Sequence, residues 1–152
     1  MVRQQSQALF NLAQIRFSSG TSADLLAARE MFERVQAIAP DAEVARSLVV
    51  VSLRLSDREA AAKYYRQYSD QLATSPAVGT FANRSELGGA LFEAGMLEEA
   101  EAELSAAIKL SPMDQPTILR LARVYIARKD FPAKDLAEFV TPGVQVGTFA
   151  GG

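Results

Sequence analysis

The chain has 152 residues and a mass of 16.4 kDa, and 49% of its residues are hydrophobic and 22% charged, which is enough apolar surface for a folded core. It contains no cysteine and no histidine, which excludes disulfides, thiolate chemistry, metal sites built from those ligands, and histidine as a catalytic base. Its net charge of −2 gives no global electrostatic reason to bind nucleic acid or an anionic membrane.

Helical periodicity begins near the N-terminus, where apolar residues recur every three or four positions. A first stripe over 9–17 ends at Gly20, and a second over 25–38 ends before Pro40. Glycine interrupts a helix, and proline cannot continue one. We therefore predict a pair of helices joined by a tight turn and followed by a stop.

The same arrangement is repeated along the rest of the chain. The later stripes occupy 44–55, 61–72, 87–94, 97–108, 118–125 and 131–140. Three prolines, Pro40, Pro76 and Pro112, follow one another at intervals of 36 residues, and a fixed period of this size indicates stacked repeats. A single helix pair cannot bury its apolar face, so neighbouring pairs stack and share a core.

We therefore predict an all-α fold, an α/α superhelix of about 3.5–4 stacked antiparallel helix pairs. The predicted helical domain spans 6–140, followed by a flexible tail or the start of a linker over 141–152. Within the second repeat, the second helix is expected to run on towards Pro76. The predicted repeats are 6–40, 41–76, 81–114 and 115–140.

The third repeat carries a recognisable pattern. Its residues are Arg84, Leu87, Gly88, Leu91, Gly95, Ala100, Leu104, Ala107 and Pro112. In order and spacing they resemble the signature of the tetratricopeptide repeat (TPR). Small residues stand where two helices would cross closely, and Gly95 stands at the turn. The first and fourth repeats match in part, and the resemblance implies a TPR-like solenoid.

The sequence also departs from the TPR signature. No repeat has its tryptophan, and Val49 stands where a small residue is usual. In the fourth repeat Lys134 and Glu138 replace the expected alanine and aromatic residue, so its second helix, about 133–140, is predicted to be a short cap.

In TPR proteins the first helices line a concave face that binds an extended peptide or a helix of a partner. The resemblance implies that this groove displays Gln7, Phe10, Asn11, Gln14, Phe17, Arg46, Val50, Leu53, Glu86, Phe92, Leu119, Arg120, Arg123 and Ile126. Exposed apolar rows bordered by polar groups are typical of binding surfaces. Alternatively, neighbouring repeats or the tail cover the apolar members.

Charged residues near the groove have two interpretations. Arg120 and Arg123 could bind an acidic ligand residue, or could pair with Glu86 and Glu93. Others are expected to be ordinary solvated charges. These are Arg54, Arg58, Lys63 and Arg66, and the run Glu98, Glu99, Glu101 and Glu103 at a helix start.

The sequence predicts a protein–protein interaction module, a TPR adaptor or chaperone-like protein that holds a linear peptide or helix of a partner. A subclass of TPR proteins clamps a terminal carboxylate, but Glu86 would repel one, and of the matching positions only Asn11 fits. The alternative is a structural segment of a longer solenoid, or a scaffold that self-associates through open repeat ends, for example in bacterial secretion or envelope assembly.

No enzyme motif is present. The sequence has no phosphate-binding loop and no H-E-x-x-H or G-x-S-x-G string, so we expect no catalysis, cofactor or metal. The expected ligand is a protein or peptide, with no nucleic acid and no insertion into a membrane. With no signal peptide in the sequence as written, a cytoplasmic location is expected, or a periplasmic one if the chain is a fragment.

Overall fold

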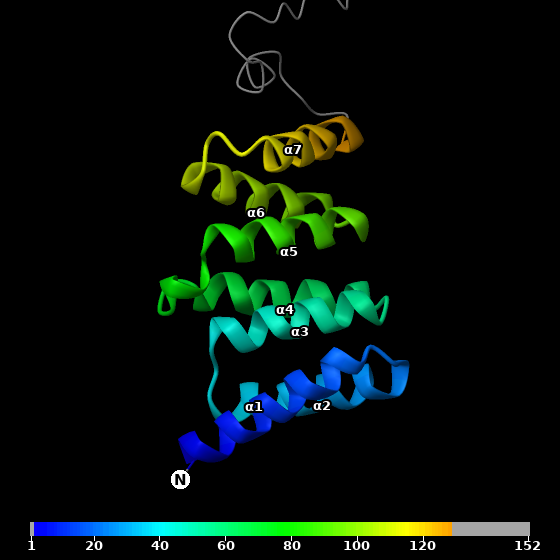
Figure 1. Cartoon of the computed structure of the whole chain (residues 1–152), viewed down its shortest axis with the longest axis vertical. Coiled ribbons are helices and arrows are strands. Elements are labelled where there is room, and N and C mark those ends of the chain that lie inside the picture. The colour runs from blue at the N-terminus through cyan, green and yellow to red at the C-terminus, as the bar shows by residue number, and fades with distance from the viewer. Residues whose placement is uncertain (1, 129–152) are drawn as a thin grey trace, which may run out of the picture.

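A computed structural model describes residues 2–128 of the chain. Over this range the helices stack as antiparallel pairs, α1 with α2, α3 with α4 and α5 with α6, and α7 packs against α6 (Figure 1). The predicted all-α superhelix is confirmed. The elements are α1 (Val2–Ser19), α2 (Ser22–Ile38), α3 (Ala42–Arg54), α4 (Arg58–Gln71), the short 3-10 helix η1 (Pro76–Val78), α5 (Phe81–Glu93), α6 (Leu97–Leu110) and α7 (Gln115–Arg128).

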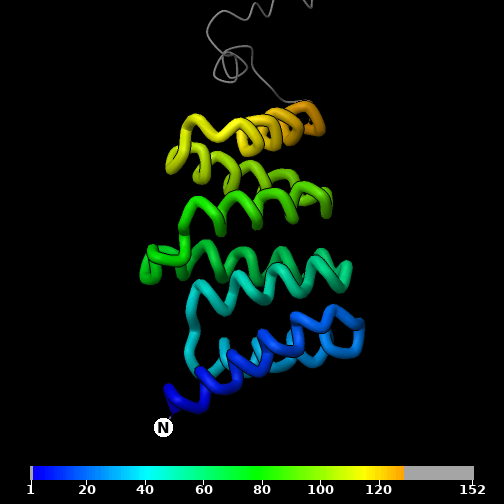
Figure 2. Tube along the Cα trace, viewed as in Figure 1, coloured from blue at the N-terminus to red at the C-terminus, as the bar shows by residue number. Residues whose placement is uncertain are grey.

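Each helix pair turns through a residue in the left-handed backbone region. Gly20 and Gly95 have φ of +74° and +80°, and Ser56 takes the same place in the second pair with φ of 58°. Glycine adopts this conformation without steric cost, whereas serine does so with some strain. The chain trace in Figure 2 shows the three turns on the same side of the stack, at the right of the view.

The third pair is held by a close crossing of α5 and α6. A Cβ atom placed on Gly88 would lie 2.6 Å from the Cγ atom of Leu104, so a side chain at that position requires Leu104 to shift. The close crossing predicted at Gly88 is therefore present. The side chains that fill the core on either side of it are fully buried, among them Phe32, Leu48, Leu87 and Leu91.

The junction between the second and third pairs differs from the others. The backbone of α2 packs closely on α3 and that of α6 on α7, whereas α4 makes no comparably close backbone contact with α5. The connection over 72–80 contains η1, which begins at Pro76. Because α4 ends at Gln71, the expectation that it continues towards Pro76 is wrong.

Long polar side chains bridge this junction. Glu103 of α6 is only 1% exposed. Its carboxylate accepts hydrogen bonds from the hydroxyls of Tyr65 (3.0 Å) and Tyr68 (2.8 Å) of α4, and from the guanidinium of Arg84 (2.8 Å) of α5. The prediction that Glu103 is a solvated charge is wrong, because it lies in the buried helical stripe between Ala100 and Ala107.

The same cluster alters the ionisation of its tyrosines. Burial is the larger cause, and the adjacent Glu103 carboxylate the smaller, of the raised pKa of Tyr65 and of Tyr68. Elsewhere on α4, burial and then Glu33 raise the pKa of Tyr64 to about 12.

The predicted cap over 133–140 and the predicted tail over 141–152 lie outside the described residues.

Candidate protein-binding groove

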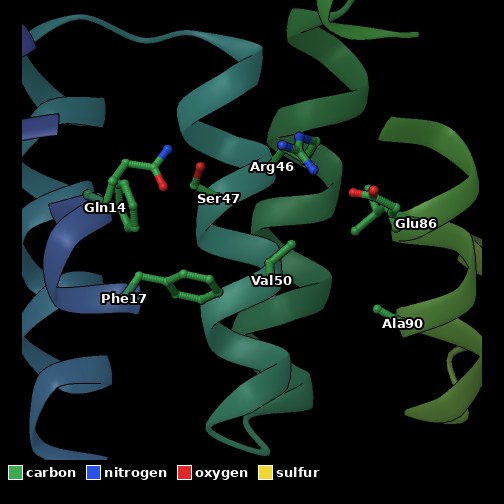
Figure 3. Close-up of a pocket in the computed structure, with 9 residues that line it drawn as sticks. Gln14, Phe17, Arg46, Ser47, Val50, Glu86 and Ala90 are labelled. Carbon is green, nitrogen blue, oxygen red and sulfur yellow. The ribbon is translucent and has the colours of Figure 1, made fainter. Parts of the chain in front are cut away.

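One hollow lies across the first helices of three successive pairs. Gln14 and Phe17 of α1, Arg46, Ser47 and Val50 of α3, and Glu86 and Ala90 of α5 surround it (Figure 3). Its volume is about 260 Å³, and Phe32 and Leu87 contribute to its floor. The hollow is therefore aromatic and aliphatic inside, with polar groups at its edge.

A second hollow continues from the first. Its volume is about 490 Å³, and it shares Val50 and Ala90 with the first hollow. Together they make one trough between α3 and α5, which we call the α3–α5 groove. The other residues that line this second part are Leu53, Arg54, Ser56, Arg58, Glu93 and Ala94.

The groove carries one arginine of α3 and one glutamate of α5 in each hollow, Arg46 with Glu86 and Arg54 with Glu93. None of these four side chains forms an ion pair with any residue in the described range 2–128. The Nε atom of Arg46 is buried without a hydrogen-bond partner. Arg46 and Glu86 point towards each other across the groove (Figure 3).

An aromatic contact closes one edge of the groove. The guanidinium of Arg54 lies 4.9 Å from the centre of the Phe17 ring, a cation–π contact between α3 and α1. This contact leaves the hydrogen-bond donors of Arg54 without a carboxylate partner in residues 2–128. The groove therefore combines an apolar centre with charges of both signs that form no ion pair within residues 2–128.

Six of the predicted groove residues meet in this trough. The structure brings together Gln14, Phe17, Arg46, Val50, Glu86 and Leu53. The sequence analysis placed Glu93 near the groove but missed Arg54, which it counted among the ordinary surface charges. The available signal was helical spacing, since Arg54 follows Arg46 by close to two helical turns on α3.

Three more predicted residues lie near the start of α1. Gln7 and Phe10 line a separate hollow of about 200 Å³. The Gln7 amide donates to the side chain of Asn11 at 3.1 Å. The Phe10 ring meets Phe32 edge to face, with 5.5 Å between ring centres, so Phe10 contributes to packing as well.

The remaining predicted residues line neither part of the groove. Phe92 is half-buried against the core. Arg120 donates to the Ser85 hydroxyl at 3.3 Å and forms no ion pair with Glu86 or Glu93. The others, Leu119, Arg123 and Ile126, are exposed on α7.

Stacked antiparallel helix pairs, a close small-residue crossing, and a trough along the first helices together define a TPR-like solenoid. Solved structures share this fold. MamA AMB-1 aligns with 95% of the chain and 78% of its own length at 21% identity, with a TM-score of 0.65. MamA MSR-1 aligns with 88% of the chain and 72% of its own length, also at 21% identity, with a TM-score of 0.63. The chain matches no protein-family model and no curated protein.

Residues 2–128 contain neither a cluster of metal-binding residues nor a helix that could span a membrane. No group of three or more acidic residues is placed to hold a metal ion there. No helix in the same range is both long and apolar enough to cross a membrane.

Proposed function

We propose that the chain is a protein–protein interaction module that binds a linear segment of a partner in the α3–α5 groove. The observation that carries this proposal is the trough itself, which joins two hollows through Val50 and Ala90. Apolar concave surfaces bordered by polar groups are typical of segment recognition, and the TPR-like fold supports a role in protein interaction.

The first experiment is selection from a displayed library of protein fragments from the source genome, followed by titration of the selected peptides. We expect dissociation constants near the micromolar range, or about −8 kcal/mol. Ala90→Phe fills the middle of the groove and is expected to weaken binding about tenfold or more, because Ala90 lines both hollows.

Ala82→Phe is the matched control, since Ala82 is exposed on the same helix and lines neither hollow. Both variants are first compared with the wild-type chain by circular dichroism. Selected peptides that bind Ala90→Phe as tightly as the wild-type chain would place the binding surface elsewhere.

A second candidate function, a part of a self-assembling scaffold, is favoured by the outer edge of α1. Leu12 and Ile15 are 41% and 67% exposed there. The first helix of each following pair, and α7, has a leucine at the position equivalent to Leu12. Each of these leucines is at most 4% exposed, because a preceding helix covers it. These leucines are Leu48, Leu87 and Leu121.

Sedimentation equilibrium tests whether a second copy of the chain covers this edge. Association that rises with concentration and is lost in Leu12→Glu would support it, and Ser18→Glu on the same helix is the control. A monomer at every concentration would exclude the scaffold as a property of this chain alone.

A further inference from the structure

The charges of the α3–α5 groove fall at two levels. Arg46 faces Glu86 in one hollow, and Arg54 and Glu93 lie in the other. The one remaining charged residue lining the groove, Arg58, donates to the backbone carbonyl of Gly95 at 3.2 Å. The α3 wall therefore carries an arginine and the α5 wall a glutamate at each level, and Arg58 of α4 adds a further positive charge to the second hollow.

The width of the junction keeps these opposite charges apart. The connection over 72–80 and the long side chains around Glu103 separate the second pair from the third. As a result Arg46 and Glu86 face each other but are not joined by any ion pair of 4.0 Å or less. An occupant that carries both signs of charge satisfies both walls.

The spacing of the two levels suits a helix. Arg46 and Arg54 are eight residues apart on α3, and Glu86 and Glu93 are seven apart on α5. At 1.5 Å per residue these intervals correspond to about 12 Å and 10.5 Å. The glutamate interval equals the seven-residue repeat of a helix face, about 10.5 Å. The arginine interval lies between this repeat and the roughly 13 Å at which an extended strand repeats a face, so the spacing argument for a helix rests on the glutamates.

We propose that the α3–α5 groove binds an amphipathic helix of a partner protein, with an apolar ridge over Val50 and Ala90, acidic side chains on the flank towards α3 and basic side chains on the flank towards α5. The proposal rests on the proposed function and adds the chemistry of the ligand. Charge complementarity carries it, because neither the arginines of the α3 wall nor the exposed carboxylates of the α5 wall form an ion pair within residues 2–128.

The test uses three designed helical peptides of equal length with the same apolar ridge. The mixed probe has glutamates on one flank and lysines on the other, the acidic probe has glutamates on both flanks, and the basic probe has lysines on both. Fluorescence anisotropy with the full chain at low ionic strength is expected to give about tenfold tighter binding of the mixed probe than of either other probe.

Variants of each wall make the test specific. Arg46→Glu with Arg54→Glu makes both walls acidic, so the basic probe is expected to become the tightest ligand. Glu86→Lys with Glu93→Lys makes both walls basic, so the acidic probe is expected to become the tightest ligand. Because both glutamates are exposed, this second variant tests the proposal even if replacing the half-buried Arg46 impairs folding. The control is Arg34→Glu with Arg66→Glu, two exposed positions outside the groove, and it should leave the order unchanged.

Three results would overturn the proposal: equal binding of the three probes, binding of none of them, or equal binding of a mixed probe that proline substitutions prevent from forming a helix. Each is distinguishable from failure of the proposed function. If Ala90→Phe weakens the binding of the genome-derived peptides, the groove remains a binding site even when the mixed probe binds no more tightly than the other two probes.

Discussion

Two junctions in the stack are packed in different ways: the one between the second and third helix pairs, and the one between α6 and α7. At the first, the buried carboxylate of Glu103 joins two tyrosines of α4 to an arginine of α5. At the second, backbones approach closely, and the small side chains of Ser85 and Thr117 share a buried hydrogen bond of 3.1 Å between α5 and α7. Long polar side chains thus hold a wide junction, and short ones a narrow junction.

The largest expected effect comes from removing the bridge of the wide junction. Glu103→Ala leaves two tyrosine hydroxyls and Arg84 without their acceptor, and we expect it to lower the free energy of unfolding by about 3 kcal/mol. Urea unfolding measures this loss. Glu98→Ala on the same helix is the control, because Glu98 is exposed. A loss no greater than that of Glu98→Ala would show that the bridge contributes little.

The close crossing inside the third pair should be nearly as sensitive. Gly88→Leu inserts a side chain where even a Cβ atom would lie 2.6 Å from Leu104, and is expected to cost about 1–3 kcal/mol. Gly89→Ala is the matched control. Its Cβ atom would lie 3.7 Å from Arg120, an ordinary contact, so this variant should gain up to about 1 kcal/mol of helix propensity. An unchanged melting temperature for Gly88→Leu would place the helix contact elsewhere.

The narrow junction should depend less on its polar contact. Thr117→Val keeps the shape of the side chain and removes the hydroxyl that meets Ser85 and donates to Asp114. We expect a loss of about 1–2 kcal/mol in urea unfolding, since the hydroxyl takes part in one neutral hydrogen bond and donates a second one to a carboxylate. If this loss equals that of Glu103→Ala, the two junctions do not differ as the structure indicates.

High pH should weaken the wide junction. The raised pKa values of Tyr65 and Tyr68 favour their neutral hydroxyls in the folded chain. This contribution is fully present below the unfolded tyrosine pKa of about 10 and is lost as the pH rises through the folded values. Stability should therefore fall between about pH 9 and 12, and less steeply in Tyr65→Phe/Tyr68→Phe. An equally steep fall in that variant would assign the effect to other groups.

The repeated architecture could be predicted from sequence because it depends on local periodicity. The glycine and proline positions mark turns at Gly20 and Gly95, and Gly88 reports a close crossing. Glu103 could not be placed in the same way, because a charge is buried only where partners from other helices meet it. Those partners come from α4 and α5, at a junction whose width sequence spacing does not encode.

The groove could be predicted only in part for a related reason. The TPR resemblance placed Arg46, Val50 and Glu86 on the concave side, and they line the trough. It did not separate them from Leu119 and Ile126, because helical phase gives the direction of a side chain but not how far apart neighbouring pairs lie. The hollow exists where the second and third pairs are most widely spaced.

The segment over 72–80 has a consequence for how the molecule responds to its ligand. It connects the two halves of the stack, and the groove lies between those same halves. A ligand seated there would contact both sides of the least closely packed boundary between helix pairs in residues 2–128, so its affinity depends on how the two halves are held relative to each other. Weakening the hydrogen bonds between Glu103 and the two tyrosines, Tyr65 and Tyr68, should therefore weaken binding of a partner, even though none of these residues lines the groove.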